Sequence, residues 1–493
     1  MAKKKKATTG LMIEEERYIR QKAIWGDEGQ AKLQQARVAV VGLGPQGVYH
    51  ALCLTALGVG NVVLVDGSSV EPGEMFLDMN VPEGARAEKY PDLLQRVNPQ
   101  VNVEGYATNL ASRIDQLALE ASTAIVDTTN SPRSKEFAIS FGQERNIPIL
   151  STSGKWGYTK LMMVNDPTDP ANLMSMFEGY EQDPLMALAM CGPGAEEVKK
   201  LILGEMDSLL REPVRYRLGD GYRFGFLKPG EEVPKPDPKI YQGLSALVKG
   251  AGALGCWGAI TLSHMGLGRA DQVDYDVFES HNANRQILAY DGIDELKAAH
   301  VATKIRTMSR GQTESDGINE MILPGFKPAR QYDVVFDFVD NPYTRAINTG
   351  WTVTGSIPMI SSGALPNSAR WNVHVPGKTA CMDCIMNIYE EGRKAEMIRR
   401  ASCAANPDPS VVMSNAIGAV NGVLDLYTIF EPEKFGQPFN GEQTYRATTP
   451  RRFGTSPRVD ACDCYGKSTP NLEITPEQID AFVAEHPHLL TDA

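Results

Sequence analysis

No stretch of this 493-residue chain is apolar and long enough to cross a bilayer, so the sequence does not predict an integral membrane protein. A surplus of basic residues is also lacking, because 61 Asp and Glu outnumber 49 Lys and Arg and give a net charge of −12. This balance argues against a broad nucleic-acid surface, which needs clustered Lys and Arg. The lysines at positions 3–6 have no apolar segment behind them and do not read as an export signal. We expect a cytoplasmic protein with no nucleic-acid or membrane partner.

Cysteine is scarce as well. The chain has eight cysteines, which are too few for a disulfide framework at this length. Without an export signal, these thiols are expected to be reduced and available for metal binding or catalysis. The hydrophobic fraction of 42% and the charged fraction of 22% are those of an ordinary globular protein. The length is sufficient for two or three domains, each with its own core.

An internal repeat sets the organisation of the chain. A strand-like run enters the G-x-G-x-x-G loop of residues 42–47, an apolar helical stretch follows, and a second strand ends at Asp66. The same order returns with the loop of residues 250–255 and a strand that ends at Asp274. The acid follows the first loop glycine by 24 residues in both copies.

The matched loops predict two βαβ nucleotide-binding units and therefore a doubly wound α/β fold. Glycines let the backbone approach a phosphate, and the helix N-terminus stabilises its negative charge. The acid at the end of the second strand suits a ribose hydroxyl. The loops alone do not distinguish a dinucleotide from ATP.

The second copy continues with residue types that a dinucleotide site does not need. After Asp274 come the N-x-N-R-Q run of residues 282–286, then Lys297, and the D-x-x-D-N segment of residues 337–341. This set resembles the ThiF/MoeB/E1 superfamily, which activates ubiquitin-like and sulfur-carrier proteins. The resemblance extends from Arg17 to the last cysteine pair. It implies an α/β fold with two Rossmann-like ThiF/E1 adenylation domains in a pseudo-dimeric arrangement.

By the same resemblance, the second copy binds ATP with Mg²⁺ and adenylates a C-terminal carboxylate. The carboxylate attacks the α-phosphate and pyrophosphate leaves, so cations must surround the triphosphate. Arg285 and Lys297 would supply them, and Asp340 would hold Mg²⁺ against the phosphate oxygens. Taken singly, these three residues fit surface charges and a turn acid equally well. The nucleotide-binding residues implied are Gly250, Gly252, Gly255, Asp274 at the ribose, Asp276, Asn282 at the phosphates, Gln286 and Asn341.

The first copy departs from this pattern. It has no N-x-N-R-Q run after Asp66, and residues 75–77 are Met, Phe and Leu. Asn130 follows the first loop glycine by 88 residues, whereas Asp340 follows its own by 90. Because an amide brings no negative charge for Mg²⁺, we infer that the first copy does not adenylate. This resembles eukaryotic E1 enzymes, in which an inactive half pairs with an active half.

The first copy is nevertheless expected to contribute one side chain. In homodimeric members of the superfamily, the arginine of an R-Y-x-R-Q start reaches into the partner's ATP site. The matching residue is Arg20, which would reach the γ-phosphate in the second copy if the copies pack as a pseudo-dimer. The alternative is an arginine that only packs on a helix face.

The domain boundaries follow from the repeat and from composition. The stretch 216–239 is rich in Gly, Pro and charge and is predicted to be a linker. The stretch 183–211 is predicted to be helical and is interpreted as an insertion in the first copy. We divide the chain into a disordered basic tail (1–13), an inactive adenylation domain (14–215), the linker (216–239), an active adenylation domain with a zinc site and crossover loop (240–470), and a C-terminal helix (471–493).

Two cysteine pairs stand where members of the family often carry structural Zn²⁺. The first pair, Cys381 and Cys384, is spaced C-x-x-C, and the second, Cys462 and Cys464, is one residue shorter. Closed tetrahedral thiolate sites are usually structural. We predict Zn²⁺ at these four residues, with free thiols as the alternative.

Cys403 lies in a small-residue segment where E1-like proteins can place a thioester acceptor. Arg399 and Arg400 nearby would favour its thiolate, which would attack the acyl-adenylate and expel AMP. The alternative is an inert small residue. Cys191 is a reserve acceptor. Cys53 and Cys256 follow the glycine loops and are expected in the core.

Three functions are compatible with this set. The first is an E1-like enzyme that adenylates a ubiquitin-like (β-grasp) protein, forms a thioester and passes it to an E2-like enzyme, as a monomer with an internal pseudo-dimer. It resembles bacterial E1-like proteins of conjugation operons, some of which act in antiphage defence. The second is a sulfur-carrier-protein or peptide adenylating enzyme of the ThiF/MoeB type without thioester transfer. The third, a non-catalytic nucleotide-binding scaffold or a dehydrogenase, is opposed by Arg285, Lys297 and Asp340.

Overall fold

The computed structural model describes residues 16–110, 113–164, 182–219, 223–224, 227, 231–401, 409–458 and 460–486. The basic tail predicted for residues 1–13 and the candidate acceptor Cys403 lie outside these residues. Within them, no helix combines the length and the apolar character needed to span a membrane.

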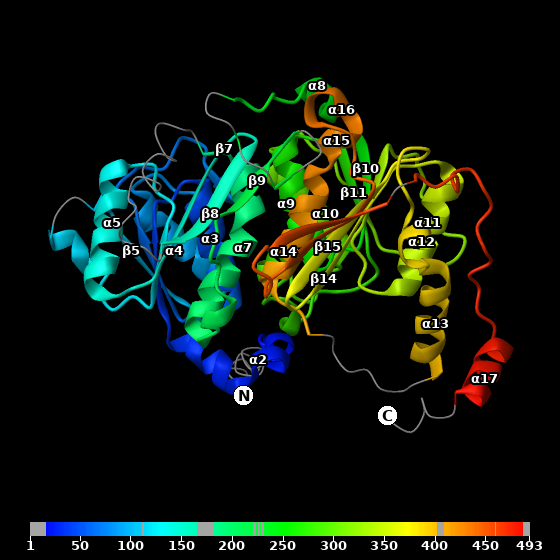
Figure 1. The fold of residues 1–493 in the computed structure, drawn as a ribbon, viewed down its shortest axis with the longest axis horizontal. Coiled ribbons are helices and arrows are strands. Elements are labelled where there is room, and N and C mark those ends of the chain that lie inside the picture. Colours follow the sequence, from blue (N-terminus) through cyan, green and yellow to red (C-terminus); the bar gives the residue numbers. More distant parts are fainter. Residues whose placement is uncertain are drawn as a thin grey trace, which may run out of the picture.

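Two β-sheets built on one plan dominate the molecule (Figure 1). In both, the first five strands of the order are parallel, and the strands beyond them are antiparallel. The seven-stranded sheet has the order β5 (Asn102–Tyr106), β2 (Asn61–Val65), β1 (Arg37–Val41), β6 (Ala124–Asp127), β7 (Ile149–Lys155), β8 (Tyr158–Val164) and β9 (Val214–Arg217). The eight-stranded sheet has the order β12 (Gly317–Ile318), β11 (Arg269–Val273), β10 (Ser245–Lys249), β13 (Val334–Asp337), β14 (Met359–Leu365), β15 (Ser368–His374), β16 (Gly441–Arg446) and β17 (Phe453–Pro457).

The predicted α/β fold with two Rossmann-like halves is therefore confirmed. The central strands β1 and β10 are nearly continuous apolar runs, as parallel strands covered on both faces require. Each runs into a glycine loop and a helix. A short two-stranded hairpin, β3 (Met75–Phe76) and β4 (Met79–Asn80), belongs to the first half.

Each half also has helices of its own. In the first half they are α2 (Ile19–Gln35), α3 (Pro45–Leu57), α4 (Arg86–Val97), α5 (Pro132–Arg145) and α7 (Pro184–Leu203). In the second half they are α9 (Ala253–Met265), α10 (Lys297–Met308), α11 (Pro342–Gly355), α12 (Met382–Met386), α13 (Ile388–Ala401), α14 (Val412–Leu424), α15 (Leu426–Phe430) and α16 (Pro432–Phe435). Short 3₁₀ helices are η1 (Arg113–Ala118), η2 (Met206–Ser208), η3 (Ser280–Asn282) and η4 (Ile287–Asp291).

The helical prediction for residues 183–211 is confirmed by α7, but its interpretation as an insertion is wrong. Helix α7 lies between β8 and β9, and α14 lies between the corresponding strands β15 and β16. The two helices are therefore equivalent elements of the two halves.

Helices α7 and α14 form the centre of the junction between the halves (Figure 1). They pack on each other, and each packs on the helix that follows its own half's glycine loop, α3 or α9. Their approach is close, because a Cβ at Gly192 would lie 2.7 Å from Ile417 Cγ1 and 2.9 Å from the carbonyl oxygen of Met413. A single hydrophobic cluster continues through both halves. The halves thus share one core and form an internal pseudo-dimer.

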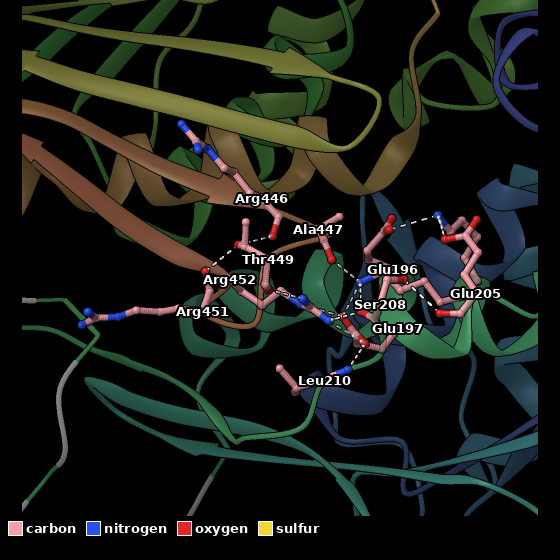
Figure 2. Close-up of polar contacts among 12 residues, drawn as sticks. Glu196, Glu197, Glu205, Ser208, Leu210, Arg446, Ala447, Thr449, Arg451 and Arg452 are labelled. Atoms are coloured by element: carbon pink, nitrogen blue, oxygen red, sulfur yellow. Dashed lines mark hydrogen bonds and ion pairs between the residues drawn. The ribbon is translucent and has the colours of Figure 1, made fainter.

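A buried ion network adds a polar connection across the junction (Figure 2). Glu197 of α7 pairs with Lys200 at 2.8 Å and with Arg452, which precedes β17 of the second half, at 3.0 Å. The amide of Leu210 also donates to Glu197, at 2.8 Å. Buried charges are tolerated only when their partners are in place, so this network favours one relative arrangement of the halves.

Strand β9 and two further helices lie near the predicted domain boundaries. Strand β9 contains the first two residues of the range predicted as a linker, and α8 (Pro238–Gln242) follows near its end. The last helix, α17 (Pro476–Glu485), begins at the predicted cap, where Thr475 and Gln478 form a capping box.

Candidate functional site

The glycine loop of the second half leaves the start of α9 accessible. Gly250 has a φ of +100°, which favours glycine, and a Cβ at Gly255 would lie 2.1 Å from the carbonyl oxygen of Gly250. At Gly252, by contrast, the nearest atom to an added Cβ is Gln286 Nε2 at 3.8 Å. The first N–H groups of a helix attract anions, so this loop can hold a phosphate.

Asp274, at the end of β11, anchors the loop. Its carboxylate accepts hydrogen bonds from the amides of Ala251 at 2.8 Å and Asp276 at 3.0 Å. Burial raises its pKa, and the two backbone hydrogen bonds and nearby Lys297 oppose that shift. The predicted ribose-binding acid therefore lies directly beside the glycine loop.

Arg285 is a buried charge of this region, because it is only 6% exposed. Its guanidinium donates to the carbonyl oxygen of His281 at 2.9 Å and to Asn284 Oδ1 at 3.0 Å. Among the described residues, the Arg285 guanidinium forms no ion pair with a carboxylate. Burial and the nearby Arg20 lower the pKa of Arg285 to about 10, so it stays charged at neutral pH.

The segment that carries Arg20 belongs to the first half and crosses the junction. Arg17, just before α2, donates to the carbonyl oxygen of Ala283 at 3.1 Å in the second half and to that of Val97 at 3.2 Å in the first. Arg20 lies close enough to Arg285 and His281 to lower the pKa of both. Two neighbouring guanidinium groups repel each other, and an anion bound between them would relieve that repulsion.

Lys297 begins α10 and pairs with Asp276 at 3.2 Å. The charges of Lys297, Arg285 and Asp274 all influence the thiol of Cys256 in the first turn of α9, where burial raises the pKa to about 12. The cations and the acid therefore converge at the glycine loop.

The loop after β13 completes this side of the region. Asp340 is exposed and lies near Arg285 and Tyr275, as the influence of its charge on both groups shows. Asn341 accepts a hydrogen bond from the amide of Thr344 at 2.7 Å and so caps α11. The side chain of this predicted nucleotide ligand therefore already serves a helix cap.

Two polar residues of the N-x-N-R-Q run differ in whether the side-chain oxygen already has a hydrogen-bond partner. Asn282 Oδ1 accepts a hydrogen bond from the amide of Glu279 at 3.0 Å, within the turn that precedes Arg285. Gln286 Oε1 is buried without a hydrogen-bond partner in the described part of the chain, and its amide faces the loop at Gly252. Such an orphaned polar atom is expected where a ligand binds.

In the first half, a side chain occupies the corresponding place. Gln182 Oε1 lies 2.4 Å from the position of an added Cβ at Gly44 and accepts a hydrogen bond from the Gln46 amide, at 3.1 Å, at the start of α3. Gln182 Nε2 donates to the carbonyl oxygen of Thr128 at 2.7 Å and to Asn130 Oδ1 at 3.4 Å. The glutamine amide thus takes the place that a phosphate oxygen would occupy, which the sequence did not predict.

The first half has also neutralised the cation that corresponds to Lys297. Arg86 begins α4, as Lys297 begins α10, and its guanidinium makes a two-pronged contact with Glu74, the shortest at 2.7 Å. Tyr90 donates to the same carboxylate at 2.6 Å. This arginine is therefore engaged inside the first half.

We predict that Gln182→Ala creates a second, weaker anion site per chain. The substitution frees the amide of Gln46 at the helix start, but the first half still has no counterpart of Arg285 or Asp340. Calorimetric titration with pyrophosphate measures the number of sites. A stoichiometry identical to that of the wild type would show that Gln182 does not close this loop.

Four cysteines meet at one place in the second half. The sulfur atoms of Cys381, Cys384, Cys462 and Cys464 lie within 4.8 Å of one another, and those of Cys384 and Cys464 are 3.5 Å apart. A tetrahedral zinc with Zn–S bonds of about 2.3 Å holds its sulfurs about 3.8 Å apart, so the four thiols fit this metal. The shorter C-x-C spacing of the second pair is therefore compatible with the site.

The remaining cysteines separate into core residues and the candidate acceptor. Cys53, Cys191 and Cys256 are all fully buried. The prediction of Cys191 as a reserve acceptor is therefore wrong, because a thiol enclosed in the junction cannot reach an acyl-adenylate. The described part of α13 ends at Ala401, two residues before Cys403.

The sequence is similar to parts of several known proteins. Adenylyltransferase and sulfurtransferase MOCS3 of Bos taurus is 31% identical over 190 residues, which are 38% of this chain and 39% of that protein. Adenylyltransferase and sulfurtransferase uba4 of Emericella nidulans is 29% identical over 161 residues, 31% of this chain and 33% of the relative. The chain thus aligns with less than half of each relative's length.

A solved structure of E. coli MccB with ATP is 18% identical and covers 46% of this chain and 68% of its own, with a TM-score of 0.38. Residues 17–192 and 234–450 match the ThiF family. One matched segment falls on each of the two halves, and together they cover most of the sequence. The chain therefore belongs to the ThiF family.

Proposed function

We propose that the second half uses ATP and Mg²⁺ to adenylate the C-terminal carboxylate of a ubiquitin-like β-grasp protein. The observation that carries the proposal is Arg285, a buried guanidinium with no carboxylate in salt-bridge range among the described residues, beside Arg20 from the other half. The residue after Arg285, Gln286, faces the loop at Gly252, which leaves a helix start accessible. Such a set favours a polyanion over the two phosphates of a dinucleotide.

Each residue has a definite task in this reaction. A cargo carboxylate oxygen attacks the α-phosphorus, the bond to the bridging oxygen breaks, and pyrophosphate leaves with the electron pair. Arg285, Arg20 and Lys297 stabilise the charge on the triphosphate as it develops. Asp274 binds the ribose, and the start of α9 binds a phosphate. Asp340 would hold Mg²⁺, which supplies positive charge at the phosphate oxygens.

We extend the proposal to thioester transfer at Cys403. Asp340 and Arg399 of α13 both influence the pKa of Tyr275, in opposite directions, so the end of this helix lies near Asp340. The thiolate would attack the acyl carbon, form the thioester and release AMP, and an E2-like enzyme would accept the cargo. Arg399 and Arg400 both pair with Glu396, at 2.7 and 2.8 Å, which reduces their support for a thiolate.

A second candidate is adenylation of a sulfur-carrier protein or peptide without thioester transfer. The names of the MOCS3 and uba4 relatives, which include sulfurtransferase, favour this alternative. The two candidates share the adenylation step and differ in whether Cys403 becomes acylated. In both, Arg20 completes the site within one chain, so a monomer suffices.

The test begins with ATP–pyrophosphate exchange, using a small β-grasp protein that ends in Gly and is encoded beside this chain. Cargo-dependent exchange supports adenylation, and its absence with every such cargo would overturn it. Non-reducing gels of wild type and Cys403→Ala then separate the candidates. A thiol-sensitive adduct lost in Cys403→Ala supports the thioester, and an adduct that survives in the variant excludes Cys403 as acceptor.

A further inference from the structure

A chain of buried amides connects the first half to Arg285. Gln30 and Gln21 lie on α2, Asn284 precedes Arg285, and Gln21 and Asn284 are both 0% exposed. Gln21 Nε2 donates to Gln30 Oε1 at 2.7 Å, and Asn284 Nδ2 donates to Gln21 Oε1 at 3.0 Å. Asn284 Oδ1 then accepts from Arg285 at 3.0 Å. Gln21 and Asn284 thus each use the side-chain nitrogen toward the first half and the oxygen toward Arg285, whereas the nitrogen of Gln30 is buried without a hydrogen-bond partner among the described residues.

The direction of this chain is determined at both ends. The indole of Trp25 can only donate, and it donates to Gln30 Oε1 at 3.2 Å. The carbonyl oxygen of Leu57 can only accept, and it accepts from Gln21 Nε2 at 2.8 Å. A guanidinium at the other end can only donate. If any one amide turned over, it would place donor against donor or oxygen against oxygen in a buried region, which is costly.

We propose that Gln21 is a positioning residue for Arg285. It holds Asn284 with its oxygen toward the guanidinium, and this oxygen and the carbonyl oxygen of His281 together fix the direction of Arg285. The inference rests on the proposed adenylation site. It gives the inactive half a second task besides supplying Arg20, because the orientation of Arg285 then depends on the packing of α2.

The same geometry explains why neutral amides occupy these positions. A carboxylate at position 284 would pair with Arg285 and compete with the triphosphate for its charge. A carboxylate at position 21 would point an oxygen at the carbonyl oxygen of Leu57. Both changes conserve volume and alter only the hydrogen-bonding pattern.

The experiment compares Gln21→Met, Asn284→Ala and the double variant in cargo-dependent ATP–pyrophosphate exchange. Loss of the buried partner is expected to lower the exchange rate at saturating ATP about tenfold in Gln21→Met. In the Asn284→Ala background, Gln21→Met should have no further effect, because the connection is already interrupted. Additive effects of the two substitutions would overturn the proposal.

Gln443→Met is the matched control. Gln443 lies in β16, is 1% exposed and donates to Asp425 Oδ2 at 2.8 Å. It should lower the melting temperature as Gln21→Met does, yet leave the exchange rate unchanged. An equal loss of exchange in the control would mean that Gln21 acts through stability alone. Wild type that binds Mg-ATP but shows no exchange would instead refute the adenylation proposal. The effects of Gln21→Met, Asn284→Ala and the double variant would then be compared through their affinities for ATP.

Discussion

Replacement of Asp340 by Asn is expected to lower ATP–pyrophosphate exchange by roughly 10²- to 10³-fold, because metal-ion stabilisation of phosphate charge is worth several kcal/mol. The substitution preserves shape and removes only the negative charge. Asp340 is exposed and forms no ion pair with any described residue, so the fold should not depend on it. The loss should therefore fall on kcat without a change in the unfolding temperature.

The chain contains its own control for this result. Asn130 occupies the corresponding place in the first half, where Gln182 donates to its side chain at 3.4 Å. Asn130→Ala should leave exchange at the wild-type rate, because the Gln182 side chain occupies the phosphate position of that half. Equal losses in Asp340→Asn and Asn130→Ala would contradict the assignment of catalysis to the second half.

Cys381→Ser is expected to reduce the zinc content and the stability together. The cluster joins the start of α12, which carries Cys381 and Cys384, to the segment 462–464, so its loss releases two distant parts of the chain. Loss of several kcal/mol would lower the melting temperature by roughly 10 °C, at about 2–4 °C per kcal/mol. Elemental analysis and thermal denaturation measure the two effects.

Cys53→Ala serves as the comparison, since Cys53 is buried in α3 and outside the cluster. It should retain the zinc content of the wild type, whatever its effect on the core. Purified wild type without zinc, or Cys381→Ser with full zinc, would show that the four thiols do not form a metal site.

The sequence predicted the two halves well because their signals are local. Parallel strands need continuous apolar runs, and a glycine loop needs glycine at fixed positions, as at Gly250 and Gly255. The acid at Asp274 then follows at a spacing set by one helix and one strand. The position of Arg20 came only from the family resemblance, since no local pattern shows that α2 crosses to the other half.

The features that the sequence missed depend on contacts between distant residues. Gln182 meets Gln46 across 136 positions, and no motif marks a glutamine as the occupant of a phosphate position. The equivalence of α7 and α14 became visible only from the strand order, because each helix lies between corresponding strands of its own sheet. The helix cap at Asn341 could have been predicted from the sequence, because an Asn-Pro pair before a helix is itself a cap signal.

The central claim is that one chain contains one complete adenylation site, with Arg20 supplied by its own inactive half. The most direct test is ATP–pyrophosphate exchange by Arg20→Ala and Asp340→Asn chains that are co-expressed with different tags and co-purified. Each variant by itself should be slow. We predict that the mixture is as slow as the average of the two, because neither chain can repair the other. Recovery of exchange in the mixture would contradict the account, since a second copy would then be supplying the missing side chain.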